Sequence, residues 1–577
     1  MTFSRAVSFI FSFIAAAIVL SMMGLMLVLF LSNRGPSIAE SSILWLRMPS
    51  SLGEQTPHDI LGLFEQRTTV SAVVDTLRKA KRDDRIAGVV IVPSTTSGMW
   101  GKVQEVRDAV IDFKTSGKPI VAYLEFGAGQ AYYLATACDE IFMTPSSPLN
   151  LVGIATYDLF VKGLLDLVGF EADMLSAGEY KTAINLYTET THTPEHREVS
   201  ESLNRDMYDQ LVDGIAEGRN LTPSRVRDVI DEGPFVGNDA VRFGLIDALV
   251  YQDEVVAGLG LGDFPNIVDF ESYQAVTEES LGILPGPQVA LIYAEGTIDF
   301  GTSSVDLQGT RTVGSQTFVE AVREAGADSS IEAIVLRIDS PGGVAIAADI
   351  MWRELKLVSA KKPLVVSMSD LAASGGYYIA APAHAIVAQP GTLTGSIGVY
   401  GGKYVFGEAL KKVGVNVEEI TDGAQAGLFA PIARFSTDAR SALQAQMDET
   451  YERFLQVVAD GRGMTRDEVD GLARGRVWTG QQAFENGLVD ALGGLQSALD
   501  LVRAEIGADP EANLVVVPYP TPSSLFDTVI DSLRTQLQSG VAEWLAPLSA
   551  QSFRSFRFLL QDHRRGQPLA LMPVFVR

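Results

Sequence analysis

The chain has 577 residues, 47% of them apolar, and a formal net charge of −26. That length implies several domains with an ordinary hydrophobic core. So acidic a chain lacks the basic surface on which a phosphate backbone binds, which excludes nucleic acid as the expected partner. The single cysteine, Cys138, leaves no partner for an intrachain disulfide and allows no cysteine-based metal cluster.

Residues 7–31 carry no charged side chain. At about 1.5 Å per residue, a helix of this length exceeds the roughly 30 Å hydrocarbon core of a bilayer. The residues that follow, Ser-Asn-Arg-Gly-Pro at 32–36, contain no A-x-A-like cleavage site. We therefore expect an uncleaved, single-pass transmembrane helix and a linker over residues 1–41. Arg5 and Arg34 flank the span and mark its orientation only weakly, and we expect the large acidic domain beyond it to lie outside the cytoplasm.

Two similar segments follow the anchor, with matching residues 245 positions apart: Tyr132 corresponds to Tyr377 (377 − 132 = 245). We place the first repeat at 42–261, a connector at 262–286, the second repeat at 287–506 and a distinct tail at 507–577. The tail has helical periodicity over 525–544 and a basic, aromatic stretch over 553–565. It either contacts lipid or packs on its own domain.

Both repeats have the same expected order of elements. These are a β-rich run (43–46; 289–293), an amphipathic helix (71–81; 316–325), a buried strand (87–92; 333–338), a second helix, and a β-branched run after Pro119 or Pro363. Short uninterrupted β-branched runs between helical periods predict parallel strands covered on both faces. The sequence therefore predicts an α/β fold built from a tandem repeat.

The two repeats differ where chemistry is expected. Ser374, in Ala-Ser-Gly-Gly-Tyr, corresponds to Gly129, and Lys181 corresponds to Ala426 at the same offset. The second repeat thus keeps a candidate nucleophile and the first repeat a candidate base. This asymmetry predicts one composite Ser/Lys active site built from two half-sites.

Ser374 follows a predicted strand and precedes the apolar run 377–381, which places its hydroxyl at a strand-to-helix turn. The glycines after it would let a substrate carbonyl approach the backbone closely. Pro-Gly-Gly at 341–343 follows another strand, and its glycines could turn backbone N–H groups toward a developing oxyanion. Taken alone, the first pattern also fits an N-capping serine and the second an ordinary turn. The glycine pair occurs only in the repeat that carries the serine.

The base that would deprotonate Ser374 is either a histidine or Lys181. No histidine of the chain stands in a triad context: His58, His192, His196, His384 and His563. His192 and His196 are spaced i, i+4, but no third ligand follows in a recognised zinc pattern, so we expect no metal site. A lysine has a pKa near 10.4, and making it neutral at pH 7 costs about 4.6 kcal/mol, which burial away from acids can supply. Most lysines lie at the surface with a solvated amine, so the case for Lys181 depends on its pairing with Ser374.

Four motifs together resemble the bacterial signal peptide peptidase A family in its long, tandem-repeat form, within the Clp-protease/crotonase superfamily. They are Tyr180-Lys181, Asp-Ser-Pro-Gly-Gly at 339–343, Ala-Ser-Gly-Gly-Tyr at 373–377 and Leu-Thr-Gly-Ser-Ile-Gly at 393–398. The resemblance implies a tandem ββα spiral fold behind one transmembrane helix, no cofactor, and a homotetramer.

The same resemblance assigns roles to individual residues. Ser374 would be the nucleophile and Lys181 the general base. Ser396 would hydrogen-bond the lysine amine and orient it. The N–H groups of Gly343 and Gly375 would form the oxyanion hole, and no residue would bind a metal.

We therefore expect a membrane-anchored serine endopeptidase that degrades cleaved signal peptides and other unfolded apolar peptides. It would lie in the bacterial inner membrane with its catalytic domain in the periplasm. One alternative is a crotonase-like acyl-CoA enzyme, which shares the superfamily fold, although the membrane span and the Ser/Lys pair argue against it. The other is a catalytically idle membrane scaffold, which a serine-directed fluorophosphonate probe would distinguish.

Overall fold

The computed structural model describes residues 24, 38–55, 68–94, 99–259, 266–306, 309–520 and 569–571. The expected anchor at 7–31, apart from residue 24, and the expected features of the tail at 525–565 lie outside these ranges. Within the described ranges, no helix combines the length and the apolar character needed to cross a bilayer.

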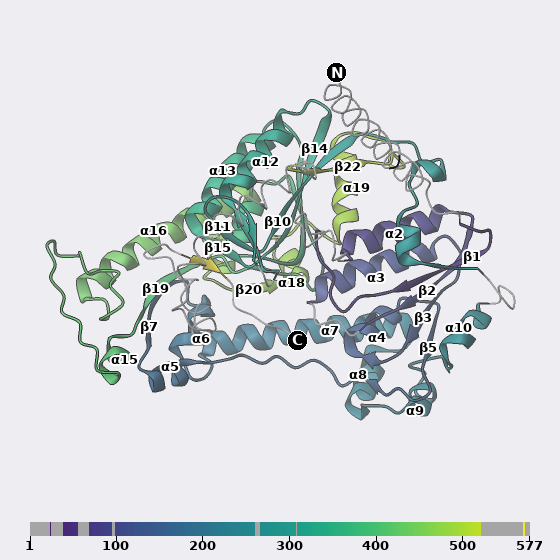
Figure 1. The fold of residues 1–577 in the computed structure, drawn as a ribbon, viewed down its shortest axis with the longest axis horizontal. Helices are drawn as coiled ribbons and strands as arrows, with labels where there is room; N and C mark the ends of the chain where they lie inside the picture. The colour runs from purple at the N-terminus through teal and green to yellow at the C-terminus, as the bar shows by residue number, and fades with distance from the viewer. Residues whose placement is uncertain are drawn as a thin grey trace, which may run out of the picture.

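The first repeat forms a six-stranded sheet in the order β8-β5-β3-β2-β1-β9, shown on the right of Figure 1. Every neighbouring pair in it is parallel. Its strands are β1 (Ser42–Arg47), β2 (Ile86–Val92), β3 (Ile120–Leu124), β5 (Glu140–Met143), β8 (Ala248–Leu249) and β9 (Ile267–Asp269). β9 comes from the segment between the repeats and pairs with β1.

Helices cover both faces of this sheet, as the uninterrupted apolar strands predict. One face packs against α2 (Val70–Arg82), α3 (Trp100–Lys114), α4 (Gly129–Ala135) and the long α7 (Pro194–Arg219). The opposite face packs against α10 (Gln252–Gly258), through Val255. Cys138 is buried on the first face, and burial raises the pKa of its thiol to about 12. This thiol is a core group and not a nucleophile.

The second repeat forms a larger sheet in the order β20-β18-β16-β14-β10-β22, with β17 beside β16 and β21 beside β17. Its strands are β10 (Gln288–Glu295), β14 (Ile331–Ser340), β16 (Leu364–Ala373), β17 (Ala385–Ala388), β18 (Leu393–Gly395), β20 (Val477–Thr479), β21 (Ala491–Leu492) and β22 (Val515–Tyr519). One face packs against α12 (Ser315–Ala327), α13 (Ala345–Ser359) and α16 (Thr437–Arg462), and the other against α19 (Leu495–Glu505).

The order of elements confirms the duplication. α12 begins 245 positions after α2 (315 − 70 = 245), and α16 begins 243 positions after α7 (437 − 194 = 243). The later pairs keep the shorter offset: α8 (Pro223–Glu232) corresponds to α17 (Arg466–Leu472), and α9 (Gly237–Arg242) to α18 (Gly480–Glu485). Two residues are therefore missing from the second copy before its long helix.

A third sheet joins the two repeats. Its order is β12-β13-β11-β15-β23-β19-β7. Its strands are β7 (Glu171–Ala177), β11 (Thr297–Asp299), β12 (Ser304–Val305), β13 (Arg311–Gly314), β15 (Gly342–Val344), β19 (Val399–Val405) and β23 (Leu569–Leu571). β7 belongs to the first repeat and pairs antiparallel with β19 of the second along its whole length, and the two lie side by side at the lower left of Figure 1. Because β7 pairs with β19, the residues that follow β7, including Lys181, lie against the second repeat.

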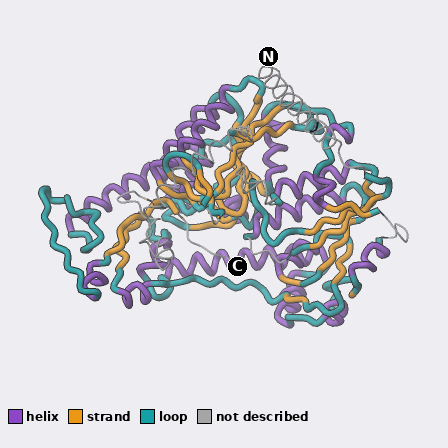
Figure 2. Tube along the Cα trace, in the orientation of Figure 1, coloured by secondary structure: helices purple, strands orange, loops and turns teal. Residues whose placement is uncertain are grey.

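The first repeat also contains a long crossing. After β6 (Leu149–Asn150) an extended segment runs beneath α7 to α5 (Lys162–Val168), as the loop parallel to the helix in Figure 2 shows. The chain then returns through β7 and α6 (Asn185–Thr188) to the beginning of α7. Lys181 thus lies between β7 and α6, in the segment that leads to the N-terminal end of α7.

Candidate active site

Ser374 lies at the predicted strand-to-helix turn. β16 ends at Ala373, and α14 (Gly375–Ala380) begins one residue after it. Ser374 has φ 57° and ψ −114°, a conformation that costs an L-residue about 1–3 kcal/mol and that occurs most often at functional sites. Its N–H donates to the Gly395 carbonyl at 2.8 Å, which holds the turn in place. The side chain is fully buried.

The Lys181 amine contacts this hydroxyl directly. Its Nζ lies 2.8 Å from Ser374 Oγ, 2.8 Å from the Ser396 carbonyl oxygen and 2.9 Å from Ser396 Oγ. Lys181 is 2% exposed and Ser396 1% exposed. One chain therefore brings Ser374, Lys181 and Ser396 together without help from a second copy.

The surroundings of Lys181 favour its neutral form. Burial lowers the pKa of Lys181 well below its ordinary value, and no charged neighbour among the described residues offsets the effect. A neutral amine has two N–H donors and one lone pair. The carbonyl of Ser396 can only accept, so an N–H must point to it, and a second N–H can reach Ser396 Oγ. The lone pair is then left for the Ser374 hydroxyl proton, which is the geometry of a base.

A loop of the second repeat holds the lysine in position. The Tyr180 N–H donates to the Arg474 carbonyl at 2.7 Å, and the Lys181 N–H to the Gly178 carbonyl at 3.1 Å. A Cβ on Gly178 would lie 2.4 Å from the Arg474 carbonyl carbon, and a Cβ on Gly475 would lie 2.4 Å from the Lys181 nitrogen. The two loops approach so closely that only glycine fits at both points.

Gly343 and Gly375 lie against each other beside Ser374. A Cβ on Gly375 would lie 3.2 Å from the Gly343 nitrogen, and one on Gly343 would lie 1.9 Å from the Ile298 carbonyl oxygen. The Gly342 N–H donates to Ser340 Oγ at 3.1 Å, so the Ser340 hydroxyl fixes the glycine turn. Sequence reasoning included Ser340 in a motif but missed this role. The serine directly before Pro-Gly-Gly was the available signal, because serine hydroxyls often hydrogen-bond turn backbone.

An extended segment of the chain already lies along this turn. β15 pairs antiparallel with β23, with Gly343 opposite Ala570. β23 also pairs with β19 at Tyr400. The backbone edge beside Gly343 therefore accepts a strand, which is how sheet edges bind peptides.

A buried ion cluster joins the repeats next to the glycine turn. Lys102, on α3, has its Nζ 2.6 Å from Asp339 Oδ2, 3.4 Å from Asp370 Oδ2 and 3.5 Å from Glu54 Oε1. Burial raises the pKa of Asp339 to about 6, although the Lys102 charge opposes the shift. Ion pairs this deeply buried tolerate little displacement, so they fix the position of the first repeat against β14 and β16. Asp339 begins one of the motifs noted in the sequence, but no local pattern links it to Lys102, Asp370 or Glu54.

The residues that correspond to Ser374 and Lys181 in the other repeat, Gly129 and Ala426, cannot form a nucleophile–base pair. Gly129 is the first residue of α4. Ala426 lies in an exposed loop before α16. Among the described histidines, His384 is exposed just before β17, and His192 and His196 lie at the beginning of α7, near Asp158.

A buried serine hydroxyl on a strained turn, hydrogen-bonded to a buried amine that favours its neutral form, is the arrangement of a hydrolase that acts through a serine nucleophile. Comparison with known proteins agrees. The model of Peptidase family S49 matches the chain twice, over residues 112–261 and 356–509. The chain belongs to this family and is a serine protease with a duplicated family domain.

Three relatives illustrate the relationship. The chloroplastic serine protease SPPA of Arabidopsis thaliana is 32% identical over 86% of this chain and 74% of its own length. Protease 4 of Salmonella typhi is 30% identical over 83% of this chain and 78% of its own. A shorter Enterococcus faecium protein, whose name assigns it as a signal peptide peptidase, is 31% identical over 48% of this chain and 78% of its own. The longer relatives span both repeats.

Proposed function

We propose that Ser374 and Lys181 are the catalytic residues and that the chain cleaves peptides through an acyl-enzyme. The observation that carries the proposal is the 2.8 Å contact between Lys181 Nζ and Ser374 Oγ. Lys181 takes the Ser374 proton as Oγ attacks the scissile carbonyl carbon. The protonated amine then gives that proton to the leaving peptide nitrogen, and a water molecule, deprotonated by the same amine, releases the acyl group.

Three further residues support these steps. The Ser396 hydroxyl and carbonyl accept the two N–H groups of the neutral amine and so direct its lone pair toward Ser374. The backbone N–H groups of Gly343 and Gly375 stabilise the tetrahedral oxyanion. The close approach of the two glycines to each other supports this shared role. The substrate binds as a strand along β15, in the position where β23 lies.

The substrates are signal peptides and other unfolded, apolar peptides. Two observations favour them: an extended backbone is required for pairing with β15, and a relative is named as a signal peptide peptidase. The family match favours neither an acyl-CoA enzyme nor an idle scaffold. The uncharged stretch at 7–31 anchors the chain in a bacterial inner membrane, with the protease in the periplasm, where released signal peptides can be reached from the bilayer. The chain assembles as a homotetramer, and its repeats adopt the Clp-protease/crotonase spiral.

One experiment tests the chemistry. The full chain in detergent is incubated with a fluorophosphonate probe and, separately, with a synthetic signal peptide. We expect one labelled residue, Ser374, and cleavage fragments that vanish in Ser374→Ala. Labelling elsewhere, or peptide cleavage by Ser374→Ala, would refute the assignment. Protease digestion of spheroplasts but not of intact cells tests the periplasmic location, and a solution mass of four chains tests the tetramer.

A further inference from the structure

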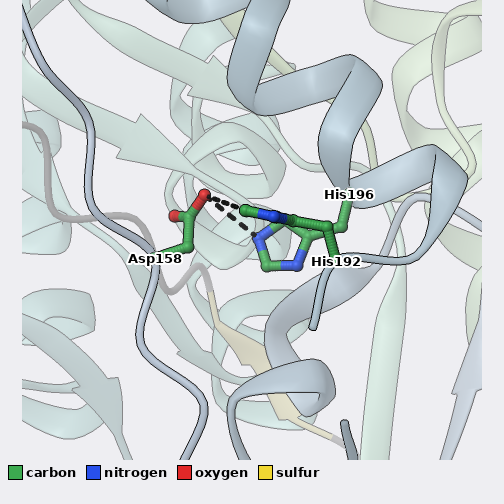
Figure 3. A group of neighbouring side chains, drawn as sticks. All are labelled: Asp158, His192 and His196. Atoms are coloured by element: carbon green, nitrogen blue, oxygen red, sulfur yellow. Dashed lines mark hydrogen bonds and ion pairs between the residues drawn. The ribbon is translucent and has the colours of Figure 1, made fainter. Parts of the chain in front are cut away.

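Three side chains converge in the first repeat, away from the Ser/Lys pair. Asp158 belongs to the extended segment beneath α7, and His192 and His196 flank the Thr193 cap of that helix (Figure 3). His192 Nε2 lies 2.8 Å from Asp158 Oδ2, and His196 Nε2 lies 3.8 Å from the same oxygen. The three possible ligand atoms all lie within 4.8 Å of one another.

The hydrogen bonds of this cluster are incomplete. His196 is 7% exposed, yet its Nδ1 has no hydrogen-bond partner among the residues that the structure describes. Its Nε2 points at Asp158 from 3.8 Å, too far for a hydrogen bond. A buried imidazole that makes no side-chain hydrogen bond is costly, and in a native protein it signals a missing water or ion.

We propose that Asp158, His192 and His196 bind a divalent transition-metal ion, with zinc as the expected occupant. Two imidazoles and one carboxylate are ligands that zinc prefers, whereas calcium and magnesium prefer oxygen ligands alone. Zinc takes such ligands at about 2.0–2.2 Å in a tetrahedral arrangement, which places neighbouring ligand atoms about 3.4 Å apart. Binding would open the His192–Asp158 pair, now at 2.8 Å, and draw the more distant pairs closer. Zinc would bind His196 at Nε2, the nitrogen 3.8 Å from Asp158 Oδ2, and would so supply one of the two partners that this imidazole lacks among the described residues.

The surrounding residues support binding. Ser200 Oγ donates to Asp158 Oδ2 at 2.7 Å, which holds the carboxylate toward the imidazoles. Such partners of a metal ligand typically change metal affinity by about 10–100-fold. His192 has a quarter of its side chain exposed, which leaves a path from solvent.

The position suggests what the metal does. It would tie the segment beneath α7 to the N-terminal end of that helix. Glu198, two residues further along α7 than His196, accepts a hydrogen bond from the hydroxyl of Tyr180, the residue before Lys181, at 2.9 Å. The site is therefore a structural clip beneath the lysine loop, and it does not depend on the proposed chemistry of Ser374.

The test uses the full chain in detergent, without a polyhistidine tag, treated with EDTA and then titrated with Co²⁺. Cobalt in a site with two imidazoles gives a visible absorption band that needs no enzyme activity. We expect one Co²⁺ per chain, displaced by Zn²⁺ and not by Ca²⁺. Asp158→Asn and His196→Gln should lose the band, and Ser200→Ala should weaken binding about tenfold. His384→Gln, an exposed histidine outside the cluster, is the matched control and should leave the band unchanged.

A melting curve recorded in EDTA accompanies each variant. Variants that melt like the wild type in EDTA, but no longer gain thermal stability from Zn²⁺, support the clip. If the wild type gives no band, or if Asp158→Asn binds Co²⁺ as well as the wild type does, the cluster is a hydrogen-bonded trio only and the proposal is wrong. Ser200→Ala keeps both histidines, so its weaker binding remains measurable if either histidine variant fails to fold.

Discussion

Replacement of Lys181 by methionine isolates the role of its amine. Methionine keeps the unbranched apolar stem and removes the atom that lies 2.8 Å from Ser374 Oγ. General-base catalysis contributes about 10²–10⁴-fold, and among the described residues the Lys181 amine is the titratable group hydrogen-bonded to Ser374. Loss at the upper end of that range lowers kcat/KM roughly 10⁴-fold, or about 5.4 kcal/mol at about 1.36 kcal/mol per tenfold. Hydrolysis of a fluorogenic peptide ester measures it.

The control is Lys403→Met. Lys403 is also largely buried, its pKa is lowered by burial, and its amine donates to the Leu428 and Ala430 carbonyls and not to Ser374. We expect this variant to keep its activity. Groups that act as a unit are strongly non-additive, so Lys181→Met combined with Ser374→Ala should be no slower than either alone. General-base catalysis contributes at least about 100-fold. If Lys181→Met therefore loses less than about 100-fold in kcat/KM, or if the losses from the two substitutions add, Lys181 is not the base.

The Lys181 amine also makes both stability and activity depend on pH. Burial lowers the pKa of Lys181, so over a range of pH the folded chain holds a neutral amine while the unfolded chain holds a charged one. The unfolded chain then binds more protons, and the free energy of unfolding rises with pH from the lowered pKa up to the ordinary value of about 10.4. kcat/KM should rise through the same lowered pKa, because only the neutral amine accepts a proton. Lys181→Arg should stay inactive at every pH, and a flat wild-type profile would contradict this reasoning.

Three further changes test the neighbouring structure. In Gly375→Ala the new Cβ lies 3.2 Å from the Gly343 nitrogen, so kcat should fall about 10²–10³-fold while circular dichroism stays unchanged. Lys102→Met leaves Asp339 buried without its closest cation, and urea unfolding should show a loss of about 3–5 kcal/mol; an unchanged midpoint would contradict this. Ala570→Pro weakens the pairing of β23 with β15. Because β23 lies where we propose that substrate binds, the KM for peptides should fall with kcat unchanged. An unchanged KM would mean that β23 does not compete with substrate.

The sheets and the serine turn could be predicted because their signals are local. Strands buried on both faces are uninterrupted apolar runs, as in 87–92, and the observed β2 contains that run. The turn at Ser374 lies between a strand and an apolar helix, with glycines where the backbone is close-packed. The approach of Lys181 to Ser374 followed from the offset between the repeats and from the family resemblance, and not from any local pattern.

Contacts between distant segments could not be predicted in this way. The β7–β19 pairing joins residues more than two hundred positions apart, and neither strand has a side-chain pattern that specifies its partner. Lys102 resembles any helical lysine until α3 is packed against Asp339. Asp158 precedes His192 by 34 residues in a segment without regular structure, so the usual zinc spacings do not apply.

The fold also explains why restoring two side chains would not create a second active site. Lys181 reaches Ser374 because β7 precedes it and pairs with β19. The residues that correspond to β7 in the second repeat, 416–422, form no strand and are exposed, and Ala426 lies in the same exposed stretch. A lysine there would stay solvated and charged at neutral pH, and so could not accept a proton from a serine. We therefore expect Gly129→Ser with Ala426→Lys, made in a Ser374→Ala chain, to bind no fluorophosphonate. Labelling at position 129 would show that the asymmetry lies in two side chains alone and not in the path of the backbone.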